Sequence, residues 1–362
     1  MIDFAALDAA KGLGPSAKNI SRLAAIFGNE AACWAFHQWS LRENAKRKFS
    51  SADEMLFTQA GLEQASHEAV AAYHASRFPI GAAVVDLTCG IGGDLIAFSK
   101  RGPTVGFEID AVTAEYAAYN AKEASVIVAD CLGSEWDFEY VFADPARRGA
   151  GGRTLNPDSF SPNPVVLAQR MRTLKFAGMK LSPMLADHYL EGISDCIEFV
   201  SFGWECREAL AWFGTENEGI RAIKVETGEK FMGGGYAQGV DEPMEIIYEA
   251  DPAAIRAHCL PQLCESLDAL LLGDSNGYLT SATFTPCNWT KAYRVLDRGA
   301  FDIKRVRGLL KEFGGGAPEV KARAKVDVAV LRKRLTSDGS GAPTVLLYAV
   351  QKSVRFALVT PI

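Results

Sequence analysis

The 362-residue sequence lacks several patterns that would assign it to a class at once. No stretch reaches about 18 consecutive apolar residues, so we expect no transmembrane helix. The first residues, Met1 to Phe4, lack the basic and apolar regions of a signal peptide. The eight cysteines include no Cys-x-x-Cys pair, and Cys259 and Cys264 have no histidine nearby beyond His258. These absences argue against a structural metal and a membrane partner, and they predict a reduced, cytoplasmic protein.

The most informative segment that is present is Val84–Asp94, in which an apolar strand leads into an acid and then into a glycine turn. Glycine has no Cβ, so such a turn lets a ligand approach the backbone closely. A dinucleotide loop needs Gly-x-Gly-x-x-Gly, and here the third glycine, Gly93, comes two residues too early. Asp86 would repel a pyrophosphate, but it suits the positively charged amino group of S-adenosylmethionine (SAM). The pattern therefore predicts a SAM loop whose binding residues are Asp86, Thr88, Cys89, Gly90, Gly92 and Asp94.

The next predicted strand carries a second acid at the spacing of a nucleotide site. Residues Pro103–Asp110 are expected to form this strand, and Glu108 lies 22 residues after Asp86. A carboxylate at that distance can accept hydrogen bonds from both ribose hydroxyls of a nucleoside. We therefore expect Glu108 to bind the ribose, with Ile109 beside it in the cofactor site.

Two more strands end in acids. A helix over Ala111–Glu123 separates the second strand from a third over Ser125–Ala129, and Asp130 is placed to accept from an adenine amino group. The fourth strand, Glu139–Ala143, leads into Asp144. Ligands of open α/β sheets bind beyond the carboxyl ends of the strands, where all these acids fall. The alternative for any one of them is a helix cap or a solvated loop.

With these residues in place, the chain resembles a class I SAM-dependent methyltransferase, which implies a Rossmann-like α/β sheet and SAM as the cofactor. The resemblance covers residues 80–150. Within that class it is similar to RNA guanine-N2 methyltransferases of the trimethylguanosine-synthase type, which carry a Cys-Gly-x-Gly-Gly-Asn loop. The matching residues are Cys89–Gly93, Glu108–Asp110 and the pair Asn120 and Ala121. Asp94 stands where that family has asparagine.

The segment that follows the fourth predicted strand departs from that family. The family has Pro-Pro-Trp, in which the aromatic ring stacks on the target guanine, whereas this chain has Pro145, Ala146 and Arg147. The resemblance implies that Asp144 and the Pro145 carbonyl hold an exocyclic amine of the acceptor. Arg147 would then stack its guanidinium plane on a base or pair with a phosphate.

A second family shares part of this motif. Residues Asp144–Gly149 are closer to the Asp-Pro-Pro-Arg-x-Gly of RNA uracil-C5 methyltransferases, which use a cysteine nucleophile on a later strand. The corresponding segment here, Gly178–Pro183, offers Ser182 and no cysteine. This difference argues against covalent uracil chemistry.

Residues 1–78 are expected to form a helical domain, because apolar residues recur at three- and four-residue intervals. The expected helices are Ala17–Phe27, Glu30–Asn44 and Leu62–Phe78. Residues Leu56–Ala65 resemble the short motif that precedes the core of related enzymes and closes over SAM. The resemblance implies that Phe57 covers the cofactor and that Thr58 caps the following helix. The alternative is that Phe57 belongs to the hydrophobic core.

The methyltransferase domain is expected over residues 79–230. Its loop Gly149–Pro162 is long and rich in glycine and proline, and we interpret it as a mobile lip over the acceptor pocket. Arg147, Arg148 and Arg153 would line this lip, where they suit phosphates or a base edge. Alternatively, these arginines make surface ion pairs.

The last two strands of this domain are expected over Ile197–Phe202 and Ala209–Gly214, as an antiparallel hairpin. Glu205 and Glu208 would lie between them, without an assignable role.

Residues 231–362 are expected to form a small α+β domain with a basic face. The segment Lys291–Arg334 holds 13 Lys or Arg and 5 Asp or Glu, a local net charge of +8 in a chain of net charge −6. Such asymmetry indicates a polyanion partner, here RNA. Small helices near Val306–Lys311 and Ala329–Leu335, with a last strand pair over Val345–Gln351 and Val354–Val359, resemble a THUMP-like domain. The alternative is a solvated face without a partner.

Three functions remain from the sequence. The first is a methyltransferase that acts on a base amine of ribosomal or transfer RNA. The second is a methyltransferase for a protein or a small molecule, and the third is a SAM-binding RNA-interaction protein without turnover. A salt-sensitive RNA complex would exclude the second, and turnover would exclude the third.

Overall fold

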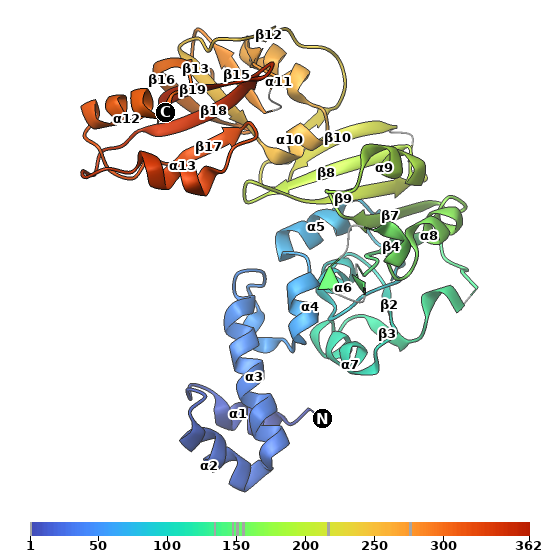
Figure 1. The fold of residues 1–362 in the computed structure, drawn as a ribbon. Helices are drawn as coiled ribbons and strands as arrows, with labels where there is room; N and C mark the ends of the chain where they lie inside the picture. Colours follow the sequence, from blue (N-terminus) through green and yellow to red (C-terminus); the bar gives the residue numbers. More distant parts are fainter. Residues whose placement is uncertain are drawn as a thin grey trace. The chain divides into compact units, whose positions relative to one another are not determined.

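The computed structural model describes residues 2–133, 135–146, 148–149, 152–153, 156–215, 218–274 and 277–362. The chain forms two compact units. The first comprises Met1–Leu181, Leu185–Ser194 and Ala211–Glu216, and the second comprises Ser182–Met184, Asp195–Leu210 and Asn217–Ile362. Figure 1 labels the elements of both units. The domain boundaries expected near residues 78 and 230 stay a prediction.

Helices form the first part of the chain, as the sequence predicts. They are α1 (Phe4–Ala10), α2 (Ala17–Phe27), α3 (Asn29–Ala45), the 3-10 helix η1 (Ala52–Glu54), α4 (Gln59–Gln64) and α5 (Glu68–Ser76). The expectation of one helix over Leu62–Phe78 is wrong, because α4 and α5 are separate. Thr58 caps α4 and His67 caps α5 with their side chains, so each helix has its own start.

Parallel strands make up the sheet of the first unit. They are β1 (Val84–Asp86), β2 (Thr104–Glu108), β3 (Ser125–Val128), β4 (Tyr140–Ala143) and β7 (Phe176–Leu181). The connecting helices are α6 (Gly93–Ser99), α7 (Ala111–Asn120), α8 (Pro164–Met171) and α9 (Asp187–Ile193). The pairings β1–β2, β1–β4, β2–β3 and β4–β7 are all parallel. The carboxyl ends of these strands therefore meet at one edge, as the sequence analysis expects.

Short elements connect these strands. They are the 3-10 helices η2 (Cys131–Gly133) and η3 (Pro157–Ser159) and the strands β5 (Arg148–Gly149) and β6 (Gly152–Arg153), which pair antiparallel. The complete first sheet has nine strands in the order β11-β10-β8-β9-β7-β4-β1-β2-β3. The order β3-β2-β1-β4 is that of a doubly wound α/β sheet.

The second unit contributes β8 (Cys196–Phe202), β10 (Gly219–Lys224) and β11 (Lys230–Met232), while β9 (Glu205–Phe213) has residues in both units. A two-residue turn joins β8 to β9, which makes them a hairpin, as expected. Two expectations need correction. Glu205 and Glu208 belong to β9 and do not lie in a connection, and two strands, β10 and β11, follow the hairpin.

A second sheet of eight strands runs in the order β12-β14-β15-β13-β16-β19-β18-β17. These strands are β12 (Gly239–Val240), β13 (Ile246–Ala250), β14 (Leu270–Leu272), β15 (Tyr278–Ser281), β16 (Thr290–Ala300), β17 (Val320–Arg323), β18 (Thr344–Val350) and β19 (Ser353–Pro361). Its helices are α10 (Pro252–Arg256), α11 (Leu260–Leu267), α12 (Ile303–Glu312) and α13 (Val328–Leu335). The expected final strand pair and both basic helices are present.

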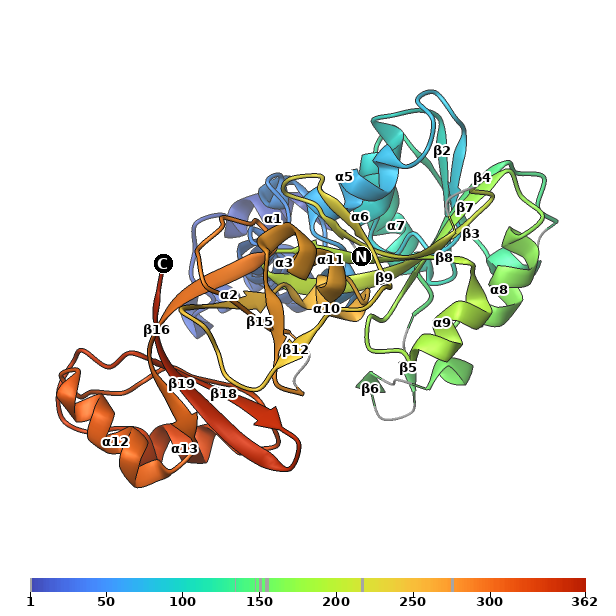
Figure 2. The same ribbon diagram turned by 90° about the horizontal axis from the view of Figure 1, so that it is seen from above.

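Helices α12 and α13 lie side by side (Figure 2), and they share a buried apolar cluster with β18 and β19. Their apolar residues Val306, Leu310 and Leu335 are buried in one cluster with residues of these strands. The remaining faces carry the charged side chains of both helices, together with exposed Val328 and Val330 on α13.

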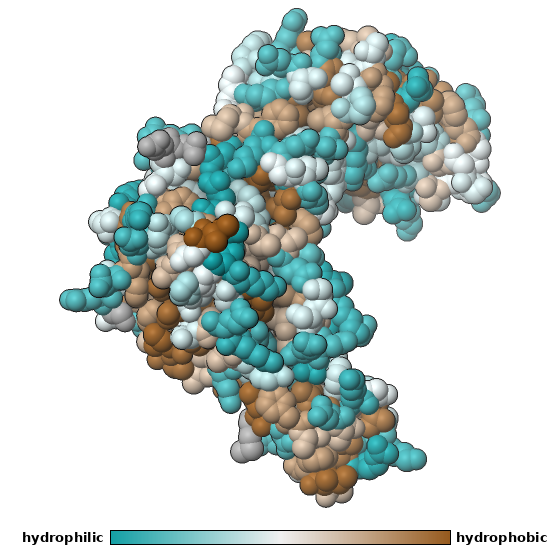
Figure 3. All heavy atoms as spheres, turned by 180° about the vertical axis from the view of Figure 1, so that it is seen from behind, coloured by the Kyte–Doolittle hydropathy of each residue, from teal (hydrophilic) through white to brown (hydrophobic). Residues whose placement is uncertain are grey.

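The surface is mixed in polarity. On the face drawn in Figure 3, hydrophilic and hydrophobic residues are interspersed. Across the described residues, no helix is both long and apolar enough to cross a membrane.

Candidate active site

The glycine loop joins β1 to α6, and its backbone needs glycine. Gly90 and Gly92 have φ angles of 54° and 88°, in the left-handed region that other residues rarely adopt. A Cβ on Gly92 would also lie 3.3 Å from the backbone of Ala117. The loop can thus turn tightly between strand and helix and keep its backbone close to α7.

Asn120, at the end of α7, fixes this loop and the segment before α4. Its side-chain nitrogen donates to the carbonyls of Ile91 (2.9 Å) and Leu56 (2.8 Å), and its oxygen accepts from the Leu56 N–H (2.8 Å). The sequence matched Asn120 to a family pattern, and the structure supplies the physical reason: one amide holds two segments that are far apart in sequence.

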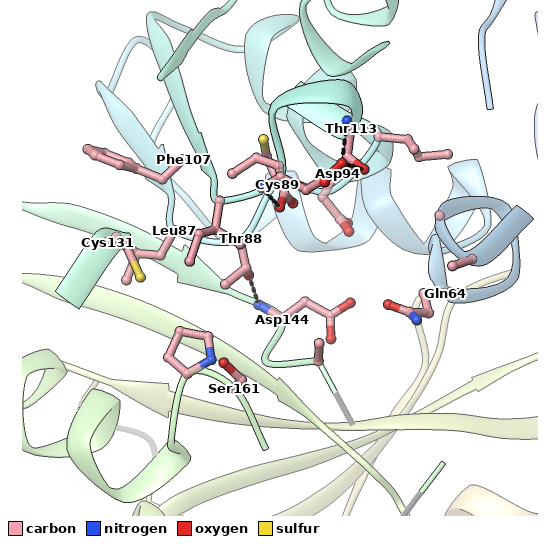
Figure 4. A pocket seen from close by; sticks show the side chains of 18 of the residues that line it. Gln64, Leu87, Thr88, Cys89, Asp94, Phe107, Thr113, Cys131, Asp144 and Ser161 are labelled. Carbon is pink, nitrogen blue, oxygen red and sulfur yellow. Dashed lines mark hydrogen bonds between the residues drawn. The ribbon is translucent and has the colours of Figure 1, made fainter. Parts of the chain in front are cut away.

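A cavity of about 530 Å³ opens beside this loop (Figure 4). The predicted site residues that line it are Thr58, Thr88, Cys89, Asp94, Glu108, Ile109, Asp130 and Asp144. Asp110 lines it as well, so five of its lining residues carry carboxylates and no lining residue that the structure describes is Lys, Arg or His. Such a wall favours a ligand that carries positive charge.

Other predicted site residues lie behind the wall or outside it. The lining does not include Asp86, Gly90 and Gly92 of the loop, nor Phe57 and Pro145. Arg147 lies outside the described residues, and of Arg148 and Arg153 only the backbone is described, in the hairpin β5–β6.

Phe57 occupies the hydrophobic core. Its side chain is 1% exposed and packs in a cluster with Phe49 and Leu62. Gln38, buried on α3, clamps its backbone, donating to the Phe57 carbonyl (2.8 Å) and accepting from its N–H (3.0 Å). This placement is the alternative that the sequence left open. The adjacent Thr58 does line the cavity, and its predicted capping of α4 is confirmed by a bond from the Gly61 N–H (2.9 Å).

The acids of the strand ends make local hydrogen bonds. Glu108 accepts from the Asp110 N–H (2.9 Å), and Asp130 accepts from the Leu132 N–H (2.9 Å). Asp110 caps α7 through the Thr113 N–H (2.8 Å). These bonds hold the carboxylates in fixed orientations at the cavity wall, so their roles as local caps and as ligand-binding groups are compatible.

Asp86 lies beneath the loop, 2% exposed, and accepts from the Thr88 N–H at 3.1 Å. Burial, and next the negative charge of Asp94, raise the pKa of its carboxyl well above the ordinary value. Burial likewise raises the pKa of the Cys89 thiol far above its ordinary value. Cys89 therefore stays protonated, so we interpret it as a small residue of the cavity wall and not as a nucleophile.

A hydrogen bond joins Thr88 of the glycine loop to Asp144, the residue that follows β4. The Asp144 N–H donates to Thr88 Oγ1 at 2.6 Å, as Figure 4 shows. Two backbone bonds then pair Ala146 with Ser161 (2.8 and 3.1 Å), so the far end of the long loop returns to the cavity, where Ser161 and Pro162 line the wall. The expected lip therefore starts and ends at the pocket.

The sequence motifs do not include the residues that support Asp94 and Asp144. His74 Nδ1 lies 2.7 Å from one Asp94 oxygen, and Ser66 Oγ donates to the other at 3.1 Å. Lys180 Nζ donates to Asp144 Oδ2 at 2.6 Å. No local pattern signals these partners, because they come from α5, from the link between α4 and α5, and from β7.

Comparisons with known proteins identify the family of the chain. No family model matches the chain. An uncharacterized SAM-dependent methyltransferase of Mycobacterium tuberculosis, from strain CDC 1551 and again from strain H37Rv, is 30% identical over 341 residues, which span 87% of this chain and 92% of the relative. A crystal structure of a protein assigned as a methyltransferase, from Porphyromonas gingivalis W83, covers 99% of this chain and 97% of its own at 19% identity, with a TM-score of 0.83.

The chain belongs to the SAM-dependent methyltransferases, and its fold is the Rossmann-like class I fold. The pocket fits SAM, because its size is that of a small-molecule site and its carboxylates suit the positive amino and sulfonium groups. Within the described part of the chain, no group of three or more His, Cys, Asp or Glu is arranged to hold a metal ion.

Proposed function

We propose that this methyltransferase transfers the methyl group of SAM to an exocyclic base amine of structured RNA, in the cytoplasm. The observation that carries the choice of an amine is the place of Asp144, directly after β4, at the cavity wall and held through its own N–H by Thr88. A fixed carboxylate can accept an N–H of an amine and orient the nitrogen lone pair.

When bound, SAM would supply an electrophilic methyl group: the acceptor nitrogen would form the new N–C bond as the S–C bond breaks, S-adenosylhomocysteine would be the leaving group, and one proton of the amine would pass to solvent. The chain's own contribution is positioning. Glu108 and Asp130 would hold the ribose and the adenine, while Asp144 and the Pro145 carbonyl would hold the amine. Arg147, Arg148 and Arg153 would contact the base or its phosphates from the lip.

The RNA acceptor is supported by the exposed cations of α12 and α13. Six of them are exposed and make no salt bridge in the described structure: Lys304, Arg307, Lys311, Arg332, Lys333 and Arg334. Affinity for nucleic acid comes largely from neutralising phosphates, so such a face supports RNA binding. We therefore assign RNA binding to this face of the THUMP-like domain.

Transfer of tritiated methyl from SAM to total RNA of cells that lack this protein tests the proposal. We expect label in that RNA and little in RNA of wild-type cells, whose sites are already modified. Label that instead enters the protein or small-molecule fraction would favour the second function, and no label in any fraction would favour a binding protein.

Asp144→Asn tests the acceptor role, because it keeps the side-chain volume and removes the charge. We expect methyl transfer to fall by about 100-fold or more while SAM still binds. Loss of SAM binding in this variant, measured by calorimetry, would contradict the acceptor role of Asp144.

A further inference from the structure

A connected chain of polar side chains leads from Asp144 into the interior of the first unit. Lys180 Nζ donates to Asp144 Oδ2 (2.6 Å) and to Ser66 Oγ (3.1 Å). Ser66 Oγ donates in turn to Asp94 Oδ2 (3.1 Å), whose other oxygen lies 2.7 Å from His74 Nδ1. None of these contacts follows from the sequence motifs or from the proposed function.

The sheet itself brings Lys180 to Asp144. Strands β4 and β7 are parallel neighbours, with Ala143 paired to Met179, so the next residues of the two strands are Asp144 and Lys180. The Lys180 side chain is 12% exposed and that of Asp144 is 30% exposed. An ammonium group with so little access to water depends on its hydrogen-bond partners for its position. Its charge is also only weakly screened by solvent.

Asp94 is held in the same way from the other side. Burial by itself would raise the pKa of its carboxyl, but the neighbouring His74 and Lys180 outweigh burial and lower it. Asp94 therefore stays ionised and anchors Ser66, which anchors Lys180. The Lys180 ammonium is thus held in place by two side chains, Ser66 and Asp94, that are themselves held by hydrogen bonds.

The positive charge of Lys180 matters because the wall of the pocket is rich in carboxylates. The cavity wall carries five carboxylates and no cation among its described lining residues. Without Lys180, Asp144 would present more negative charge to a SAM bound in this cavity, and that charge would attract the positive sulfonium. That attraction would compete with the hydrogen bond that Asp144 is proposed to make to the acceptor amine.

We propose that Lys180 is a positioning residue that holds the Asp144 carboxylate toward the acceptor amine and cancels its attraction for the SAM sulfonium. The acceptor part of this statement rests on the proposed function, and the charge part rests only on the use of SAM. The two parts make separate predictions.

Binding of SAM and of S-adenosylhomocysteine (SAH), which keeps the amino group but lacks the sulfonium charge, tests the charge part without any acceptor. Calorimetry on the full chain gives the ratio of SAM affinity to SAH affinity. We expect Lys180→Met to raise this ratio by about fivefold or more, because the positive charge of Lys180 then no longer offsets the negative charge of Asp144. Lys180→Arg should keep the wild-type ratio, and the double variant Lys180→Met with Asp144→Asn should return close to it.

Unfolding followed by circular dichroism shows whether each variant is folded. Lys180→Gln removes the charge but keeps a donor, so it replaces Lys180→Met in the ratio measurement if the latter does not fold. An unchanged ratio in a folded variant that lacks the charge overturns the proposal.

Methyl transfer to RNA from deficient cells tests the acceptor part. We expect Lys180→Met to lower kcat by about tenfold or more without raising the KM for SAM, and Lys180→Arg to restore much of it. Full turnover in Lys180→Met would overturn the positioning role. If the wild type labels no RNA and the SAM-to-SAH ratio still shifts as expected, the proposed acceptor is wrong and the control of charge by Lys180 stands.

Discussion

Asp86 and Asp94 are both buried near the glycine loop, but the pKa values of their carboxyls are shifted in opposite directions. Asp86 is buried without a cationic partner among its described contacts, and burial raises the pKa of its carboxyl. Asp94 is buried as well, but His74 and Lys180 lower its pKa. In the unliganded protein the raised pKa of Asp86 costs stability as pH rises above the ordinary carboxyl pKa. A cation bound close to Asp86 would offset that cost, so we expect a positively charged ligand to stabilise the ionised Asp86 carboxylate.

Asp86→Asn tests this account. SAM binding should release protons from the wild type and tighten as pH rises, because the amino group of SAM favours the ionised Asp86 and lowers its pKa in the complex. We expect the variant to bind SAM about 1–3 kcal/mol more weakly at neutral pH, to lose this pH dependence and to be more stable without ligand.

Calorimetry in two buffers of different ionisation enthalpy counts the protons released, and thermal unfolding gives the stability. The same pH dependence in wild type and variant would show that Asp86 is not the group that responds to SAM.

Elements differ in how far the sequence predicted them. The strand-end acids Glu108, Asp130 and Asp144 could be predicted as neighbours, because the carboxyl ends of parallel strands meet at one edge. Phe57 could not be decided, because a buried ring and a cofactor lid have the same local pattern. Lys180 could not be found at all, since its partners depend on the register of β4 against β7 and on a break between α4 and α5.

A second feature that only the structure reveals is an ion pair inside the second unit. Lys224 on β10 donates to Asp251 Oδ2 at 2.8 Å, and Ser201 on β8 donates to the same oxygen at 2.6 Å. Asp251 is 0% exposed, and its other oxygen caps α10 through the Ala253 N–H. One carboxylate thus ties α10 to two strands.

Lys224→Met should therefore destabilise the protein strongly, by about 3–5 kcal/mol, because it leaves Asp251 buried and unpaired. Asp251→Asn in the same chain should recover part of the loss. The exposed Lys325→Met is the matched control and should change little. Thermal unfolding by circular dichroism measures all three, and an unaltered midpoint in Lys224→Met would mean that the pair contributes nothing to folding.

The whole molecule combines an acidic chain with a basic C-terminal segment. The sequence predicted this asymmetry from charge alone, and the structure adds that Val306, Leu310 and Leu335 of α12 and α13 are buried while most cations of these helices are exposed. Charge composition could not show which face each cation occupies, because that depends on the packing of both helices on β18 and β19.

Replacing Lys304, Arg307 and Lys311 with glutamine should weaken RNA binding and lower its salt dependence, by roughly 0.7–0.9 in log–log slope for each phosphate that is no longer neutralised. SAM affinity should not change. The matched control replaces three exposed cations of the first unit, Lys18, Arg22 and Arg47. Filter binding across a salt series measures the effect, and equally weakened binding in the two triple variants would deny α12 a specific role.

The central claim is that the methyl group of SAM reaches a base amine, and nucleoside mass spectrometry tests it most directly. RNA from cells that lack the protein is incubated with the full chain and SAM that carries a deuterated methyl group, then digested to nucleosides. The account predicts one deuterated nucleoside with the methyl group on an exocyclic nitrogen, absent when Asp144→Asn replaces the wild type. A deuterated methyl group on carbon or on a ribose oxygen, or none in RNA at all, would contradict it.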